Sequence, residues 1–203
     1  MDIVVTGFGY YGGYWNNPSG EIARLLDGVL INNFRVRGFV LPVSFNKARV
    51  ILREILESFK PKLVLGLGLN PSTRMVDLEL ASVNKAFFTQ PDVDGFTAKY
   101  IDVEGGGPSI LYTTLPVEKI LVECREKRLL PLKPSLSTGL FLCNTIAYII
   151  MKYGVERNVP AGFLHIPPST INQLRRETGF GLPLQDILDT VRCVLEVSTS
   201  GLN

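Results

Sequence analysis

The sequence is poor in the side chains that bind metal ions and build disulfide frameworks. Its 203 residues include one histidine and three cysteines, which are too few and too scattered to form a convincing zinc site. An odd number of cysteines without paired spacing also fits a reducing cytoplasm better than a secreted, disulfide-stabilised fold. We therefore expect a cytoplasmic protein that needs neither a metal nor another cofactor.

Charge and hydropathy exclude further classes of protein. The net charge is +2, and the basic residues are interspersed with acidic ones, so no basic block marks a nucleic-acid or membrane-surface partner. No segment is both long enough and free enough of charge to cross a bilayer, and the N-terminus lacks the basic flank and apolar run of a signal peptide. The length and the 46% hydrophobic content suit one globular domain over residues 1–203.

Strand-like and helix-like runs alternate along the chain. Short apolar runs predict strands at residues 3–6, 36–43, 62–69, 75–83 and 162–166. Capping residues and apolar residues at helical spacing predict helices at residues 18–26, 45–59, 116–124, 143–153 and 186–197. Residues 85–110 are rich in glycine, which predicts an irregular and flexible region. Strands interleaved with helices indicate an α/β fold, with a sheet sandwiched between helices.

Cys143 is the first candidate for chemistry. It lies at the end of a small, polar, glycine-containing turn, residues 135–140, where an almost wholly apolar helix begins. The free N–H groups and the dipole at a helix start favour thiolate over thiol, and the thiolate is the nucleophile. The alternative is an inert, buried cysteine. Cys124 fits that alternative because it continues an apolar helical stripe, and Cys193 lies beside such a stripe with no activating neighbour.

His165 and Glu79 are candidate partners for this thiol. Cysteine–histidine chemistry needs a base that takes the thiol proton and a third group that orients the base. His165 is the sole imidazole in the chain, although a lone histidine in an apolar strand is more often part of the core. Glu79 lies in a strand-like stretch with Asp77 on the same face. From the sequence alone, an exposed acid on an edge strand is the simpler interpretation of Glu79.

A glycine-rich turn near the N-terminus offers a competing interpretation. Gly7, Gly9 and Gly12 have the G-x-G-x-x-G spacing of dinucleotide-binding turns, and Asp27 follows at a plausible distance. However, the helix is postponed to Pro18, and the pyrophosphate site of such a fold requires a helix that begins inside the motif. The aromatic-rich loop instead resembles the wall of an apolar ligand pocket.

Together, the motifs resemble those of the pyroglutamyl peptidase type I (pyrrolidone-carboxylate peptidase) family of cysteine peptidases, over nearly the whole chain. The resemblance rests on the first loop from Phe8 to Asn17-Pro-Ser, on Glu79 followed by Val83-Asn84, and on the segments around Cys143 and His165. Leu41-Pro-Val, the strand at 62–69, Pro91-Asp and Thr114-Leu-Pro match it as well.

The resemblance implies both a fold and a mechanism. The implied fold is a single-domain, three-layer α/β/α sandwich with a twisted, mostly parallel (mixed) sheet, which commonly assembles into homodimers or tetramers. The implied reaction removes an N-terminal pyroglutamyl (5-oxoproline) residue from peptides through a thioester. Cys143 would be the nucleophile, His165 the base and acid, and Glu79 the group that orients His165.

The implied substrate pocket is apolar. Phe8 and Tyr11 would supply aromatic faces for the lactam ring. Asn17 and Phe141 are further substrate-binding candidates, and Phe163 is another possible aromatic wall.

The chain also departs from the pattern of this family. Leu80 and Thr89 stand where relatives carry arginines, Tyr10-Tyr11 replaces Pro-Phe, and Thr138 replaces an alanine. A cation near the reacting centre can contribute several kcal/mol to lowering the barrier, and Arg74 is one conceivable substitute. Two alternatives therefore stay open. One is a diverged relative with altered acyl specificity or little activity, and the other is a non-enzymatic ligand-binding protein.

Overall fold

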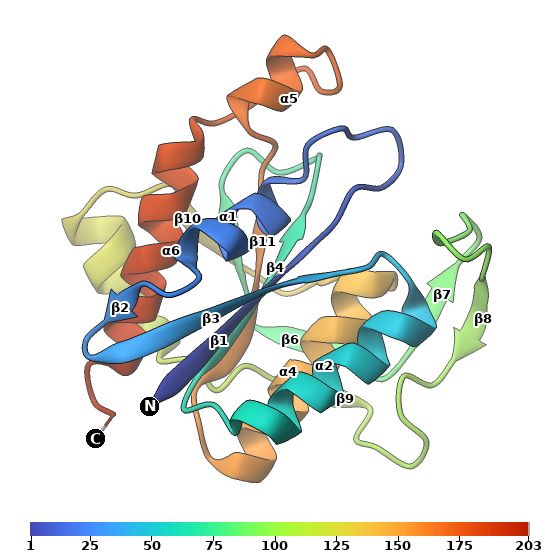
Figure 1. Ribbon diagram of the computed structural model, residues 1–203, viewed down its shortest axis with the longest axis horizontal. Helices are drawn as coiled ribbons and strands as arrows, with labels where there is room; N and C mark the ends of the chain where they lie inside the picture. Colours follow the sequence, from blue (N-terminus) through green and yellow to red (C-terminus); the bar gives the residue numbers. More distant parts are fainter. Residues whose placement is uncertain (203) are drawn as a thin grey trace.

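Figure 1 shows the computed structural model, which describes residues 1–202. Its strands are β1 (Asp2–Phe8), β2 (Leu30–Ile31), β3 (Phe34–Leu41), β4 (Val64–Leu69), β5 (Val76–Glu79), β6 (Ala81–Val83), β7 (Ala86–Phe88), β8 (Ala98–Ile101), β9 (Ile110–Tyr112), β10 (Leu132–Ser135) and β11 (Ala161–Ile166). Its helices are α1 (Pro18–Leu26), α2 (Phe45–Phe59), α3 (Val117–Ile120), the π-helix η1 (Leu121–Lys127), α4 (Leu142–Arg157), α5 (Thr170–Leu174) and α6 (Leu184–Thr199).

The main sheet has the strand order β10-β5-β11-β4-β1-β3-β2. Strands pair in parallel, except where β11 meets β5 and where β2 meets β3. The short strands pair separately, β6 with β9 and β7 with β8. The mixed, mostly parallel sheet that the family resemblance implies is confirmed.

Helices cover both faces of this sheet. Figure 1 shows α1 and α6 over one face and α2 and α4 over the other. Ile22 of α1 and Val194 of α6 belong to one buried apolar cluster, whereas Leu52 of α2 and Ile150 of α4 belong to a second. The predicted three-layer α/β/α arrangement is therefore confirmed. Within residues 1–202, no helix combines the length and apolar character needed to cross a membrane.

Several predicted elements coincide closely with the structure. The helix at 18–26 is α1, with Asn17 as its N-cap and Pro18 in its first turn. Ser44 caps α2 as expected, because its hydroxyl accepts a hydrogen bond from the Lys47 N–H at 3.1 Å. The apolar strand at 62–69 corresponds to β4, which lies in the middle of the sheet.

Three predictions about the middle of the chain need correction. The expected strand at 75–83 is divided into β5 and β6, which belong to different sheets. Residues 85–110 are not simply irregular, because they contain β7, β8 and the start of β9. The helix at 116–124 is α-helical only through α3 and continues as the π-helix η1.

The interpretation of all three cysteines as unpaired is also wrong. Cys124 of η1 and Cys193 of α6 form a disulfide. Both are fully buried in the apolar cluster that α1 and α6 share, and their Cα atoms are 5.9 Å apart, which suits a disulfide. Packing of the two helices brings these residues together across 69 positions of sequence, a pairing that spacing along the chain cannot reveal.

Candidate active site

Cys143 lies in the first turn of α4 and is partly exposed. The turn before it is held by Thr138, whose hydroxyl donates a hydrogen bond to Asn144 Oδ1 at 2.8 Å. Asn144 in turn donates to the carbonyls of Val83 and Lys85 at 2.9 and 2.8 Å. The start of α4 is therefore tied to the segment that follows Glu79, which holds the thiol at the free N–H groups of the helix.

The glycines of β4 make room for this thiol. A Cβ atom at Gly68 would lie 2.7 Å from the Sγ of Cys143 and 2.8 Å from the Phe163 ring. A Cβ atom at Gly66 would lie 2.5 Å from the same ring. Distances under 3 Å are not tolerated without displacement. This role of Gly66 and Gly68 is not among the predictions from the sequence, although a G-x-G pattern inside an apolar strand signals a close approach by another group.

His165 lies near the end of β11 and is 6% exposed. Its Nδ1 is 2.7 Å from Oε1 of Glu79, which ends β5 and is fully buried. The antiparallel pairing of β5 with β11 sets Glu79 opposite Phe163 and Asp77 opposite His165. The interpretation of Glu79 as an exposed acid on an edge strand is therefore wrong, because β10 covers the other side of β5.

The charges around His165 favour its protonated form. Burial alone would lower the pKa of His165, but the negative charges and hydrogen bonds of Cys143 and Glu79 outweigh burial and raise it to about 10. Because Nδ1 faces Glu79, Nε2 is the ring nitrogen left for another partner. These surroundings therefore favour the imidazolium form of His165 at neutral pH.

Asp77 and Arg74 are engaged elsewhere. The Asp77 carboxylate lies 2.8 Å from Lys133 Nζ and accepts a hydrogen bond from Thr73 at 3.1 Å. Arg74 stacks over the ring of Phe180, with its guanidinium 5.5 Å from the ring centre. The suggestion that Arg74 replaces an absent arginine therefore has no support in this geometry.

A cavity of about 390 Å³ opens beside Cys143. It has the size of a small-molecule site. Its walls come from the end of β1, the first loop, the ends of β3 and β4 with the residues after them, Gln90 and the start of α4. The lining residues are Phe8, Tyr11, Gly12, Tyr14, Asn17, Val43, Leu69, Pro71, Gln90, Phe141, Leu142 and Cys143.

The four predicted substrate-binding residues, Phe8, Tyr11, Asn17 and Phe141, all line this cavity. Phe163 does not, because it lies under the site with its ring edge-on to His165 at 5.3 Å. Sequence reasoning missed the other lining residues, since they come from loops that only the fold brings together. As described across residues 1–202, the lining contains no lysine or arginine.

The glycine-rich turn after β1 serves packing rather than a phosphate. A Cβ atom at Gly7 would lie 2.1 Å from the Ser19 carbonyl oxygen, so glycine allows β1 and α1 to touch. Asp27 accepts a hydrogen bond from the Gly38 N–H at 2.9 Å and is thereby fixed to β3. Within residues 1–202, no three histidine, cysteine or acidic side chains gather in a way that could hold a metal ion.

A cysteine thiol that interacts with an imidazole paired to a buried carboxylate belongs to a set of groups that can attack a carbonyl carbon, as in cysteine hydrolases. Comparison with known proteins agrees with that class. A family model described as pyroglutamyl peptidase matches residues 1–200. The chain belongs to the pyroglutamyl peptidase family, whose members are cysteine peptidases.

Individual relatives support the same assignment. The pyrrolidone-carboxylate peptidase of Pyrococcus furiosus is 36% identical over 169 residues, which cover 82% of this chain and 81% of the relative. The enzyme of the same name from Chromobacterium violaceum is 33% identical over 97% of this chain and 91% of its own length. The structure of a mutant Pyrococcus furiosus pyrrolidone carboxyl peptidase matches with a TM-score of 0.94 at 30% identity, covering all of both chains.

Proposed function

We propose that Cys143, His165 and Glu79 carry out the reaction that family membership assigns to this chain, which is removal of an N-terminal pyroglutamyl residue from a peptide. The observation that carries the proposal is the 2.7 Å contact between His165 Nδ1 and a wholly buried Glu79. Cys143 lines the cavity and contributes to the raised pKa of the same imidazole. A buried carboxylate orients the imidazole and stabilises its protonated form, and the imidazole accepts the proton of the thiol.

In the first step, the Cys143 thiolate attacks the carbonyl carbon of the pyroglutamyl residue. The carbonyl π electrons move to oxygen, and the resulting oxyanion is stabilised by the backbone N–H of Cys143 at the start of α4. His165 then donates its proton to the departing amine as the carbon–nitrogen bond breaks. The products of this step are the shortened peptide and a thioester on Cys143.

In the second step, water hydrolyses the thioester. The imidazole of His165, now neutral, takes a proton from the attacking water. Collapse of the tetrahedral intermediate releases pyroglutamate and restores the thiolate–imidazolium pair. Glu79 keeps Nδ1 facing away from the substrate throughout, so that Nε2 handles both proton transfers.

The cavity suits a small, neutral lactam ring. Phe8, Tyr11 and Phe141 offer apolar faces to such a ring. Asn17 donates one amide hydrogen to the Gly9 carbonyl at 2.8 Å, and its carbonyl oxygen accepts from Ser19. Its second amide hydrogen is available for the lactam carbonyl. Since 5-oxoproline has no free amine, a pocket wall without charged groups fits it.

The same proposal covers the domain organisation, location and assembly of the protein. Residues 1–203 form one pyroglutamyl-peptidase-like domain that acts in the cytoplasm as a homo-oligomer, a dimer or a tetramer, without nucleic acid or membrane as a partner. The Cys124–Cys193 disulfide is compatible with a reducing compartment because both residues are fully buried and shielded from soluble reductants.

Release of fluorescence from pyroglutamyl-aminomethylcoumarin tests the proposal. The wild-type protein should hydrolyse it, whereas prolyl-aminomethylcoumarin, which carries a charged amine, should be a poor substrate. Cys143→Ala should lose turnover to background while keeping the circular-dichroism spectrum of the wild type. A folded wild type that releases no fluorophore would contradict the proposal and favour a relative with altered acyl specificity, since Leu80 and Thr89 replace arginines. Equal turnover by Cys143→Ala would remove this thiol from the mechanism.

A further inference from the structure

The first loop, residues 9–16, forms one wall of the cavity and is attached to the protein at its base. Asn172, which is fully buried, donates to the Asn16 carbonyl at 2.8 Å, and the Trp15 N–H donates to Glu177 at 3.1 Å. These contacts fix the end of the loop that leads into α1. Gly12 and Gly13 at its tip are exposed and have positive φ angles of 65° and 86°.

Tyr11 connects this loop to Pro91, the residue after Gln90 of the cavity lining. Its hydroxyl donates a hydrogen bond to the Pro91 carbonyl at 2.6 Å, across 80 positions of sequence. Burial and the nearby Asp92 charge raise the pKa of the Tyr11 hydroxyl, so the group keeps its proton and acts as a donor at neutral pH. The ring of Tyr11 also lies 5.7 Å from that of Phe141, centre to centre.

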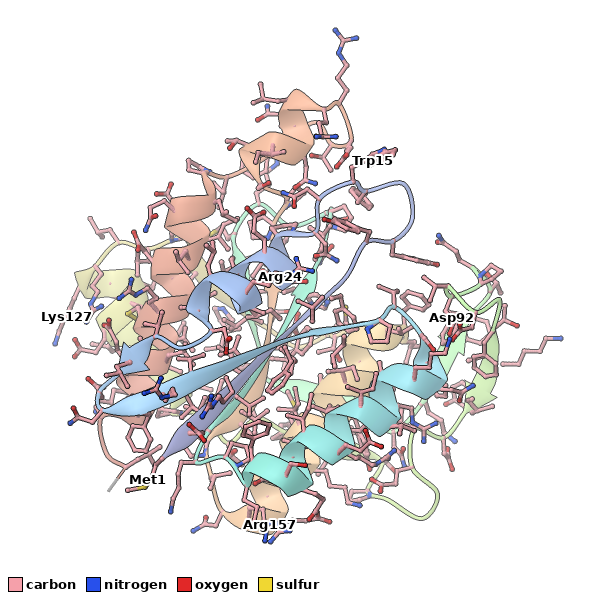
Figure 2. All side chains as sticks on the ribbon, viewed as in Figure 1. Met1, Trp15, Arg24, Asp92, Lys127 and Arg157 are labelled. Atoms are coloured by element: carbon pink, nitrogen blue, oxygen red, sulfur yellow. A yellow bond between two sulfur atoms is a disulfide. The ribbon has the colours of Figure 1, made fainter. Side chains whose placement is uncertain are left out.

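The Pro91 carbonyl, which accepts this hydrogen bond, belongs to a segment that further hydrogen bonds hold in place. Asp92, which follows Pro91, receives hydrogen bonds from the backbone N–H groups of Phe45, Asp94 and Phe96 at 2.8 to 2.9 Å. The Val93 N–H donates to the carbonyl of Val43, which lines the cavity, at 3.1 Å. Figure 2 labels Trp15 on the first loop near the top of the view and Asp92 on the other segment at the right.

We propose that the Tyr11 hydroxyl is a latch that holds the first loop against Pro91 and thereby sets the width of the acyl pocket. This inference rests on the proposed function. With the latch closed, the Tyr11 ring is preorganised against a flat five-membered lactam, and less binding energy is spent on ordering the loop. Tyr11 is thus a positioning residue that determines specificity, and it takes no part in bond making.

The kinetic test compares Tyr11→Phe with Tyr10→Phe. Tyr11→Phe removes only the hydroxyl, and loss of one neutral hydrogen bond should raise KM for pyroglutamyl-aminomethylcoumarin about three- to tenfold, with kcat within about twofold of the wild type. The preference for pyroglutamyl over its six-membered lactam homologue should fall as well. Tyr10 lies on the same loop, is 63% exposed and has no side-chain hydrogen bond within residues 1–202, so Tyr10→Phe should match the wild type. A lower kcat for Tyr11→Phe at unchanged KM would overturn the proposal.

Chymotrypsin provides a readout that does not depend on activity. Each variant keeps an aromatic cleavage site at its changed position, so the rate of nicking in the first loop reports how often the loop opens. Tyr11→Phe should be nicked several times faster than the wild type and Tyr10→Phe. Equal nicking rates for Tyr11→Phe and the wild type would show that the hydroxyl does not restrain the first loop, whether or not the protein is active. If the wild type hydrolysed no pyroglutamyl substrate, the proposed function would fail, while the nicking rates would still decide for or against the latch.

Discussion

At the scale of single residues, the chemistry depends on how one carboxylate is buried. Glu79 and Asp77 lie two residues apart on the same face of β5, yet Glu79 faces His165 and Asp77 faces Lys133. Strand periodicity predicts the shared face but not the partners. The partners follow from the antiparallel pairing of β5 with β11 and the parallel pairing of β5 with β10, which are long-range contacts.

The first prediction concerns the charge of Glu79. Glu79→Gln should lower kcat/KM about 10- to 100-fold, because a charge-assisted hydrogen bond contributes about 1.5–3 kcal/mol. The pKa of His165 is raised to about 10, so the wild type should lose activity on the alkaline side only as the pH nears that value. Without the carboxylate, the alkaline limb should move to lower pH.

Asp77→Asn is the matched control for this prediction, because its partners are Lys133 and Thr73. Its pH profile should keep the alkaline limb of the wild type. The raised pKa of His165 also makes the free energy of unfolding depend on pH. A raised pKa means that the protonated form of His165 stabilises the folded state, fully below pH about 6.5 and progressively less as the pH rises toward 10. If the pH profiles of kcat/KM in Glu79→Gln and wild type were superimposable, the carboxylate would have no role in charging His165.

At the scale of elements, β4 is the strand against which the side chains of the site pack. Its sequence predicts a buried central strand, and the structure places it between β1 and β11. The glycines at positions 66 and 68 allow Phe163 and the Cys143 thiol to approach the strand backbone. Sequence patterns identified the strand because its residues are continuously apolar, but the use of its glycines depends on α4, which arrives much later in the chain.

Alanine substitutions in β4 should separate packing from catalysis. Gly66→Ala and Gly68→Ala both place a Cβ atom within 3 Å of the Phe163 ring, and each should lower the free energy of unfolding by about 1–3 kcal/mol. Only the Cβ atom at position 68 also meets Sγ of Cys143. Gly68→Ala should therefore lose at least about tenfold more kcat than Gly66→Ala. Urea titration and steady-state kinetics measure the two effects, and equal kcat losses would contradict this account of β4.

For some elements, local sequence signals are enough to predict the bounds of a helix. Helix α1 and helix α2 were predicted almost residue for residue, because Asn17-Pro18 and Ser44 are local capping signals. The division of the 75–83 stretch into β5 and β6 was not predicted. Its residues all favour strands, and the change of sheet at Leu80 follows from tertiary contacts, since the Leu80 N–H bonds to the Ser135 carbonyl and its own carbonyl accepts from Thr113.

At the scale of the whole molecule, the sheet separates two cores with different tasks. The cluster beneath α2 and α4 supports Cys143, and the cluster beneath α1 and α6 contains the disulfide. The sequence predicted both helical layers, but it did not predict the disulfide. Loss of the disulfide should therefore lower the stability of the fold and leave the activity unchanged.

Removal of the disulfide tests this separation. The double variant Cys124→Ala with Cys193→Ala should lose about 4 kcal/mol of unfolding free energy, as expected for a closed loop of 69 residues. Its kcat/KM should stay close to that of the wild type. Wild-type protein unfolded in a thiol reductant controls for the packing change, since it loses the bond but keeps both sulfurs. A loss of activity that parallels the loss of stability would show that the two cores are coupled.

Counting thiols in the native protein checks the same feature. Among residues 1–202, Cys143 is the free cysteine and the other two are paired. Iodoacetamide should therefore label one site in the native protein and three after reduction and unfolding. Labelling of Cys124 or Cys193 in the native protein would mean that the disulfide is absent.

The central claim is that the reaction passes through a pyroglutamyl thioester on Cys143. The most direct measurement is an acid quench of the enzyme during turnover of a pyroglutamyl substrate, followed by digestion and mass spectrometry. We predict a mass increase of one pyroglutamyl group on the peptide that contains Cys143. Turnover with the pyroglutamyl group attached to another residue would contradict the account.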